Sequence, residues 1–156
     1  MSYEIIRAQL TSAVAFTAHC GVSLDEIGNG KAAASLPFRK EGLNHIGTQH
    51  AGALFAVGEA ASGAAMAGAF SSVLLGIRPV AAEATIRYFK TAKGAVRAEA
   101  TIQGNPDELL KSLHGDGKIA FPVNVDLLDG ASGEKLAEMT VQWHVTDISK
   151  PKAAHA

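Results

Sequence analysis

The sequence predicts an α+β protein in which a six-stranded antiparallel sheet curls around one long central helix. Two observations carry this prediction: a run of small, almost uncharged residues at 51–70, and flanking segments in which apolar and polar residues alternate. Consecutive strands joined by short turns favour antiparallel pairing. The long apolar helix is the only expected element large enough to cover one face of such a sheet.

Length and composition favour a single ordinary domain. The chain has 156 residues, with 14 Lys and Arg against 15 Asp and Glu, which gives no basic footprint for nucleic acid. Apolar residues make up 47%, which argues against disorder, and the single Cys20 excludes an internal disulfide. The N-terminus lacks the pattern of a secretory signal. We therefore expect a cytoplasmic protein with one domain over 1–148 and a loose tail over 149–156.

The elements follow from local signals. A helix is expected over 1–20, with Ser2 as its N-cap and Gly21 as its stop. Two strands at 22–27 and 31–38 are joined by a Gly-Asn-Gly turn. Pro122 requires a bulge or a strand edge, because it has no amide donor. After the central helix, alternating apolar residues predict strands at 84–88, 96–102, 119–127 and 139–145, and a short helix is expected within 105–117.

The central run has the length of a membrane span, about 20 residues, and Glu59 is its only charge. Alanine and glycine dominate it, and a lone glutamate near the middle of a span is costly in lipid. A helix that is apolar on all sides outside lipid must be surrounded by protein. We therefore interpret the run as a central helix and expect no membrane span.

Glu59 is the strongest candidate for chemistry, because the residues around it are apolar or small. Burial of a carboxylate is costly in free energy unless it forms an ion pair or a hydrogen bond, and a buried carboxylate without such a partner indicates a catalytic role. Desolvation raises a carboxylate pKa toward neutrality, which suits a general base or acid. The alternative is that Glu59 pairs with a structural arginine or a backbone amide at a subunit interface.

His50 and Asn44 are the next candidates. His50 directly precedes the helix, beside first-turn amides, from Ala51 and Gly52 onward, that can bind a developing oxyanion. Nine residues, about two and a half turns, separate His50 from Glu59, so they cannot share a face of one straight helix. Either His50 lies off the helix, or the two act in different sites across a dimer. Asn44 can bind a carbonyl or a water through its side-chain amide. The structural alternatives are that His50 caps the helix or lies at an interface and that Asn44 is a turn residue.

Metal and cofactor chemistry find little support in the sequence. A His45 and His50 pair lacks the usual ligand spacing and a carboxylate of matching reach. No glycine-rich phosphate loop is present, so we expect neither a metal nor a cofactor. Four basic residues cluster around one expected hairpin and form either a solvated turn or a phosphate contact: Arg87, Lys90, Lys93 and Arg97.

The run at 44–53, NHIGTQHAGA, with Glu59 nine positions past the second histidine, resembles the hotdog-fold thioesterases of the phenylacetic-acid-pathway type. The segment at 84–94 is similar to the third strand and turn of that family, and the resemblance covers about 22–145. It implies a hotdog fold with an added N-terminal helix, and a homodimer or a dimer of dimers (a homotetramer). It also implies hydrolysis of an acyl-CoA thioester to the free acid and CoA at the dimer interface.

The resemblance implies a role for each catalytic candidate. Glu59 would act as general base on water or as nucleophile. The Ala51 amide would polarise the thioester carbonyl. Many members of the family have a glycine at this position, and the methyl group of Ala51 narrows the path of the substrate to the amide. His50 would orient the site, and Asn44 would hold the carbonyl or the water.

Further contacts with substrate follow from the same resemblance. Several relatives hold the water with a Ser or Thr on the third strand, where this chain has Ala81, so Thr85 or Ser62 is a candidate substitute. Lys90 and Lys93 would bind CoA phosphates. The expected substrate-binding residues are Gly52, Ser62, Thr85, Lys90 and Lys93.

Two other functions stay open at this point. One is a non-catalytic acyl-CoA-binding protein in which Glu59 is structural. The other is a hotdog-fold hydratase or dehydratase acting on acyl thioesters, which also pairs a histidine with an acid.

Overall fold

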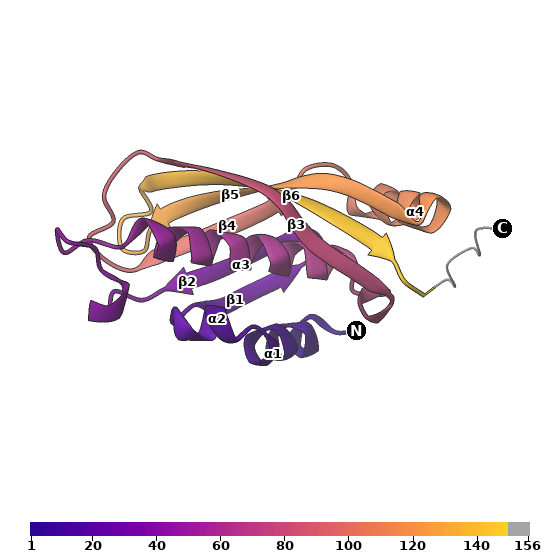
Figure 1. The fold of residues 1–156 in the computed structure, drawn as a ribbon, viewed down its shortest axis with the longest axis horizontal. Helices are drawn as coiled ribbons and strands as arrows, with labels where there is room; N and C mark the ends of the chain where they lie inside the picture. The colour runs from indigo at the N-terminus through magenta and orange to yellow at the C-terminus, as the bar shows by residue number, and fades with distance from the viewer. Residues whose placement is uncertain (150–156) are drawn as a thin grey trace.

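The computed structural model describes residues 1–149 and contains one six-stranded sheet with four α-helices (Figure 1). The helices are α1 (Tyr3–Ala13), α2 (Ala15–His19), α3 (Ala51–Ala69) and α4 (Pro106–Asp116). The strands are β1 (Ser23–Gly28), β2 (Lys31–Leu36), β3 (Ile77–Tyr88), β4 (Val96–Ile102), β5 (Lys118–Asp129) and β6 (Lys135–Asp147).

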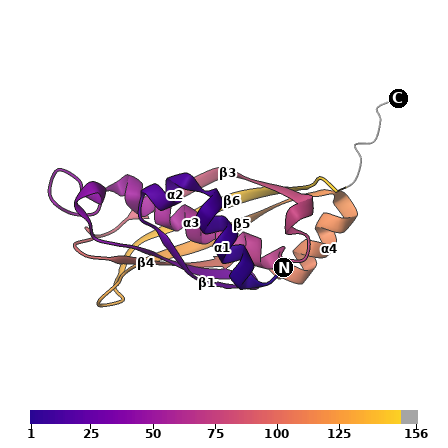
Figure 2. The same ribbon diagram turned by 90° about the horizontal axis from the view of Figure 1, so that it is seen from below.

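The strands are ordered β1-β2-β4-β5-β6-β3, and every neighbouring pair is antiparallel. Figure 1 shows α3 lying lengthwise against the sheet, and its main contacts are with β2, β4 and β5. In the view from below, α1 and α2 extend across α3, and α1 contacts β1 as well (Figure 2). The predicted α+β class, the six strands, the central helix and the added N-terminal helix are confirmed.

Glycines in α3 allow the sheet to approach its backbone closely. A Cβ atom on Gly68 would lie 2.0 Å from the carbonyl oxygen of Gly28 in β1. A Cβ atom on Gly58 would lie 2.7 Å from the Met139 Sδ atom of β6. Within the described residues, no helix has the length and hydropathy needed to cross a membrane. The run at 51–70 is therefore a central helix, and its small residues serve packing.

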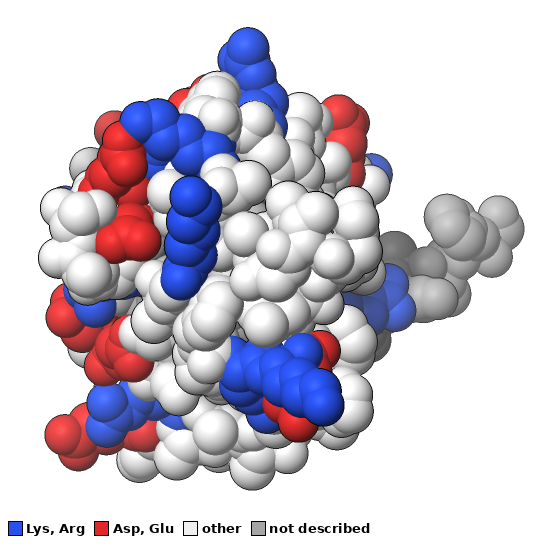
Figure 3. Space-filling model, turned by 90° about the vertical axis from the view of Figure 1, so that its left-hand side faces the viewer, with Lys and Arg blue, Asp and Glu red and all other residues white. Residues whose placement is uncertain are grey.

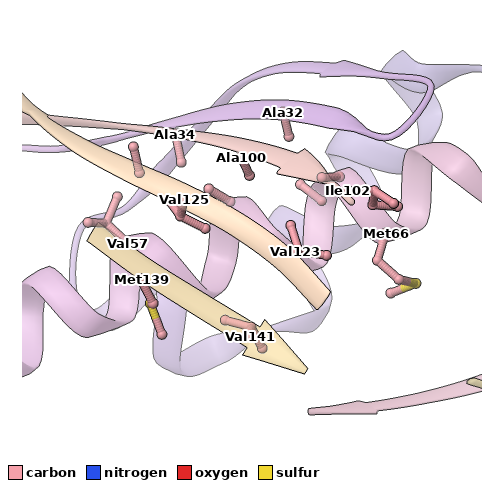
Figure 4. Packing of buried hydrophobic residues seen from close by; sticks show 14 of the residues in the cluster. Ala32, Ala34, Val57, Met66, Ala100, Ile102, Val123, Val125, Met139 and Val141 are labelled. Carbon is pink, nitrogen blue, oxygen red and sulfur yellow. The ribbon is translucent and has the colours of Figure 1, made fainter. Parts of the chain in front are cut away.

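The core lies between α3 and the inner face of the sheet (Figure 4). Alternate residues of β4, β5 and β6 point inward, as their periodicity predicts, and removing each such Val or Leu from water contributes about 1.5–3 kcal/mol. The buried inward residues include Ala98, Ala100, Val123, Val125, Leu127, Met139 and Val141.

The two edges of the sheet differ. The β1 edge is covered by α1, whose Arg7 donates from Nη1 to the Asp25 carbonyl oxygen at 3.1 Å. The other edge is β3, a strand of 12 residues that pairs with β6 and is exposed along most of its length. A long exposed edge strand is a template for pairing with another strand. The open edge of the molecule is therefore the one that carries β3.

Two local features refine the predicted elements. Ser2 caps α1 as expected, but the N-terminal helix breaks at Val14 (φ −101°, ψ 84°) into α1 and α2 rather than running unbroken. Pairing of β4 with β5 ends at Ile102 and Val123, and Pro122 is the next residue of β5 beyond this last pair. Pro122 therefore lies where β5 has a local edge on the β4 side, as its missing amide donor requires. The predicted tail over 149–156 lies, apart from Ser149, outside the described residues.

Candidate functional site

The loop before α3 is anchored by Gln49, a buried residue that the sequence analysis did not single out. Its Nε2 atom donates to the Pro37 carbonyl oxygen at 3.0 Å and to the Gly94 carbonyl oxygen at 3.1 Å. Its backbone amide donates to the Ala92 carbonyl oxygen at 2.9 Å. Gln49 thus joins the end of β2 and the segment after β3 to the start of α3. These partners are distant in sequence, so no local pattern marks the residue.

Asn44 closes the same loop with its whole side chain. Its Oδ1 atom accepts from the backbone amides of Ile46 and Thr48, both at 3.1 Å. Its Nδ2 atom donates to Thr48 Oγ1 at 2.7 Å and to the Gln49 carbonyl oxygen at 3.3 Å. An amide nitrogen carries two hydrogens, and both are used here. Asn44 therefore occupies the turn role, and it has no free amide hydrogen for a substrate carbonyl.

His50 lies off the helix, which is one of the two arrangements expected from its spacing to Glu59. It is the N-cap of α3, with φ −67° and ψ 140°. Its Nδ1 atom accepts from the backbone amide of Gly52 at 2.8 Å. A neutral imidazole in this position carries its proton on Nε2. Among the described residues, this Nε2–H donates no hydrogen bond, so the ring keeps one donor available.

The capping pattern leaves one amide free in the first turn of α3. Gly52 donates to His50 Nδ1, so its amide is engaged rather than available for a substrate. The amides of Ala53 and Leu54 donate to the His50 carbonyl oxygen at 2.9 and 3.1 Å. Among the described residues, the remaining amide, that of Ala51, donates no hydrogen bond. The Ala51 N–H is therefore the donor that this helix end offers to an oxyanion.

A pocket of about 290 Å³ lies beside this helix end, between the first turn of α3 and the chain that follows β3. Tyr88 donates from its hydroxyl to the Ala51 carbonyl oxygen at 3.0 Å, and burial raises the pKa of Tyr88. In the sequence, Tyr88 is marked only as part of an expected strand. Its position at the end of β3, next to the basic hairpin, was the available signal. The pocket is lined in part by Ala51, Leu54, Tyr88, Phe89 and Ala92.

The two lysines expected near CoA differ in their surroundings. Lys90 forms an ion pair with Glu134. Lys93 is exposed, and within residues 1–149 it forms no ion pair. Figure 3 faces the end of the molecule where α3 begins and shows an uncharged area bordered by separate Lys and Arg side chains. Lys93 is thus the freer of the two cations.

Glu59 lies on a side of α3 that is incompletely buried. Phe55 and Gly63, one turn before and after it, share this side and are also incompletely buried. Among the described residues, no donor or cation contacts the half-buried carboxylate. Desolvation by burial raises the pKa of Glu59. The structural alternative, a pair with an arginine or a backbone amide at a subunit interface, finds no such partner among residues 1–149 of the same chain.

Two further candidates do not meet the Glu59 carboxylate. Ser62 is fully buried, and its hydroxyl donates to the Glu59 carbonyl oxygen at 2.7 Å while accepting from Trp143 Nε1 at 3.2 Å. Thr85 lies opposite Thr140 on the face of the sheet that points away from α3. A water-holding role beside Glu59 is therefore inconsistent with the position of either hydroxyl in this chain.

The site residues fall into two groups on α3. His50, Ala51 and Tyr88 meet at the helix start, whereas Glu59 lies eight residues beyond Ala51. At a rise of 1.5 Å per residue, this places the Ala51 amide and the Glu59 backbone ~12 Å apart along the axis. Within the described residues, no three His, Cys, Asp or Glu side chains are grouped to hold a metal ion.

Several solved structures with the same architecture carry the name thioesterase. A protein of unknown function from Pseudomonas aeruginosa, called a probable thioesterase, is 27% identical with a TM-score of 0.80, over 94% of this chain and 97% of that chain. A thioesterase from Haemophilus influenzae is 16% identical with a TM-score of 0.75, over 98% and 96% of the two chains. A mutant of the phenylacetic acid degradation protein PaaI from Thermus thermophilus is 20% identical with a TM-score of 0.65, over 83% and 97%.

The fold is thus the hotdog fold, and the resemblance found in the sequence is confirmed at this level. No curated protein matches the chain. Residues 3–145 match the family described as a domain of unknown function, DUF4442. Because this match spans most of the chain, the protein belongs to the DUF4442 family.

Proposed function

We propose that the protein hydrolyses an acyl-CoA thioester to a free acid and CoA, with Glu59 as the reacting carboxylate. The names of the similar structures support hydrolysis of an acyl thioester in general. The observation that carries the assignment is the Glu59 carboxylate itself. It is half-buried, has a raised pKa, and contacts no donor or cation within residues 1–149.

The chemistry requires a base or nucleophile of this kind. As a base, Glu59 takes a proton from water while the water oxygen bonds to the thioester carbon. The C–S bond then breaks, and the CoA thiolate takes up the proton. As a nucleophile, Glu59 attacks the thioester carbon, the C–S bond breaks as the CoA thiolate leaves, and a mixed anhydride forms. Water then cleaves the anhydride to the free acid and the Glu59 carboxylate, and its released proton goes to the CoA thiolate. Both routes give one acid and one thiol from each thioester and each water.

The Ala51 amide supplies the second requirement, a donor to the carbonyl oxygen as it becomes negative. It is the unengaged amide at the positive end of α3. His50 supports this donor because it holds the first turn through Gly52, and its Nε2–H is free to orient the substrate. Asn44 contributes through the loop that it closes.

Both groups can act on one carbonyl when they come from two copies of the chain. The ~12 Å between the Ala51 amide and the Glu59 backbone along α3 is too long for one reacting carbon. The exposed β3 edge offers a surface on which a second copy can pair. We therefore place the site at an interface of a homodimer, with Lys93, and Lys90 beside it, toward the phosphates of CoA.

Replacement of Glu59 tests the function. With a panel of acyl-CoA thioesters and a thiol-detecting reagent, we expect Glu59→Gln to lower kcat by at least about a hundredfold while acyl-CoA still binds. Glu108→Gln, at an exposed glutamate in the first turn of α4, is the control and should keep full activity. Equal, slow thiol release by the wild type and Glu59→Gln, with intact binding, would instead identify a binding protein. Consumption of an unsaturated acyl thioester without thiol release would identify a hydratase.

The same variant predicts a pH effect on stability. Burial raises the Glu59 pKa in the folded state, so the ionised carboxylate opposes folding above that pKa. We expect Glu59→Gln to melt at a higher temperature than the wild type at neutral pH. The difference should shrink as the pH falls through the folded-state pKa, because the wild type then becomes protonated. Thermal melts across this range check the sign.

A further inference from the structure

We propose that Ser62 and Trp143 are positioning residues for Glu59, and that they hold the reacting turn of α3 on strand β6. This inference rests on the proposed function, because it concerns the placement of the same carboxylate. It also replaces the expectation that the Ser62 hydroxyl contacts the substrate.

A chain of two hydrogen bonds connects β6 to the backbone of Glu59. The Trp143 indole nitrogen donates to Ser62 Oγ at 3.2 Å, and Ser62 Oγ donates to the Glu59 carbonyl oxygen at 2.7 Å. The Ser62 hydroxyl has one hydrogen, which goes to Glu59, and one lone pair that receives the indole hydrogen. The direction of both bonds is therefore fixed by the chemistry of the three groups.

The two hydrogen bonds that link Trp143, Ser62 and Glu59 are shielded from solvent. Ser62 is 0% exposed and Trp143 is 7% exposed, so water does not compete for either bond. An indole N–H in such a place needs an acceptor, and Ser62 provides it. The indole also lies against Gly63, where a Cβ atom would be 3.4 Å from Trp143 Cζ2. Residues 59–63 thus rest on Trp143 through both a polar link and a packing contact.

Glu59 depends on this support more than a paired carboxylate would. Within the described residues, its side chain has no hydrogen bond or ion pair that could fix it. The backbone of residue 59 therefore determines where the carboxylate lies. A displacement of about 1 Å at a reacting group can lower the rate about a hundredfold. The buried link to β6 is the feature that prevents such a displacement.

The test compares Ser62→Ala, Trp143→Phe and the double variant with the wild type in the thioesterase assay. We expect each single variant to lower kcat between about 10- and 100-fold, with KM within about twofold because neither side chain touches substrate. The kcat of the double variant should be little lower than that of the more affected single variant, because both substitutions break the same pair of hydrogen bonds. The acidic limb of the kcat/KM profile should move to lower pH, because a displaced carboxylate gains water.

Val141→Ala is the matched control. Val141 is a fully buried residue of β6, two positions from Trp143, with an apolar side chain. It should lower the melting temperature but leave kcat and the pH profile unchanged. If Ser62→Ala and Trp143→Phe lower stability alone, with kcat within twofold and an unmoved acidic limb, the two residues are merely structural and the proposal is wrong. The same holds if Val141→Ala loses kcat to the same extent.

A spectroscopic measurement keeps the test decisive if Trp143→Phe does not fold. Trp143 is the only tryptophan, so its indole N–H gives one identifiable NMR signal. Ser62→Ala removes a single hydroxyl and should shift this signal and speed its exchange with solvent. An unchanged signal would overturn the hydrogen-bonded chain itself. A wild type without thioesterase activity would overturn the proposed function, which is a distinct outcome.

Discussion

Ala51 carries the sharpest single-residue prediction about the site. Proline is tolerated at the first position of a helix, where its fixed φ fits and its missing amide hydrogen breaks no helical bond. His50, directly before it, already has the extended conformation that a following proline requires. Ala51→Pro therefore deletes the proposed oxyanion donor while α3 stays intact. We expect kcat to fall by at least about a hundredfold in the thiol-release assay.

Ala51→Gly is the control for that variant, since it keeps the amide and removes only the methyl group. It should retain wild-type kcat, and KM should fall or stay constant because the approach to the amide becomes wider. Circular dichroism should show the same helix content in all three proteins. Full activity of Ala51→Pro would show that the Ala51 amide takes no part in catalysis.

At the scale of elements, the contact between α3 and β1 predicts an unusual effect of alanine in a helix. Alanine normally stabilises a helix by about 1 kcal/mol relative to glycine. At Gly68, however, the new Cβ atom would lie 2.0 Å from the Gly28 carbonyl oxygen, which is backbone and cannot rotate away. We expect Gly68→Ala to destabilise the protein by about 1–3 kcal/mol in urea denaturation, because helix and strand must move apart.

Gly115 in α4 provides the comparison for this effect. A Cβ atom there meets no atom within 4 Å, so Gly115→Ala should stabilise the protein by up to about 1 kcal/mol. Opposite signs for the two glycines would demonstrate close packing of α3 on β1. Equal stabilisation of both variants would contradict it.

At the scale of the whole molecule, the separation of Glu59 from Ala51 predicts complementation between two inactive variants. In a symmetric dimer whose sites combine one residue from each chain, a hybrid of Glu59→Gln and Ala51→Pro contains one site with both groups intact. Unfolding and refolding the two variants together should restore about a quarter of the wild-type activity, because half of the dimers are hybrids with one active site of two.

Refolding each variant alone is the control and should give no activity. Light scattering at micromolar concentration should show a dimer or a tetramer for every variant. A monomer, or a mixture without recovered activity, would place both groups in one chain and contradict the proposed interface.

Much of the fold could be predicted from the sequence because its signals are local. Alternation at 96–102, 119–127 and 139–145 marked the inward faces of three strands, and these faces are buried. The Ala- and Gly-rich run predicted α3 because a helix without large side chains needs protein on all sides. Thr85 was expected to contact substrate, but Ala84 and Ile86 on either side of it pack against the core, so Thr85 lies on the outer face.

The sequence by itself determined that Glu59 is the lone charge of the 51–70 run, and it favoured a central helix over a membrane span because small side chains and a mid-run glutamate suit a helix surrounded by protein. Only the tertiary structure decided which polar groups are free. Asn44, Gly52 and Ser62 are engaged, and the Ala51 amide is not. For Ser62 the physical reason is that folding brings Trp143 to it from 81 residues away, where no local pattern records the contact. The partners of Asn44 and Gly52 lie within five residues, and the folded loop and helix start show that these local bonds are formed.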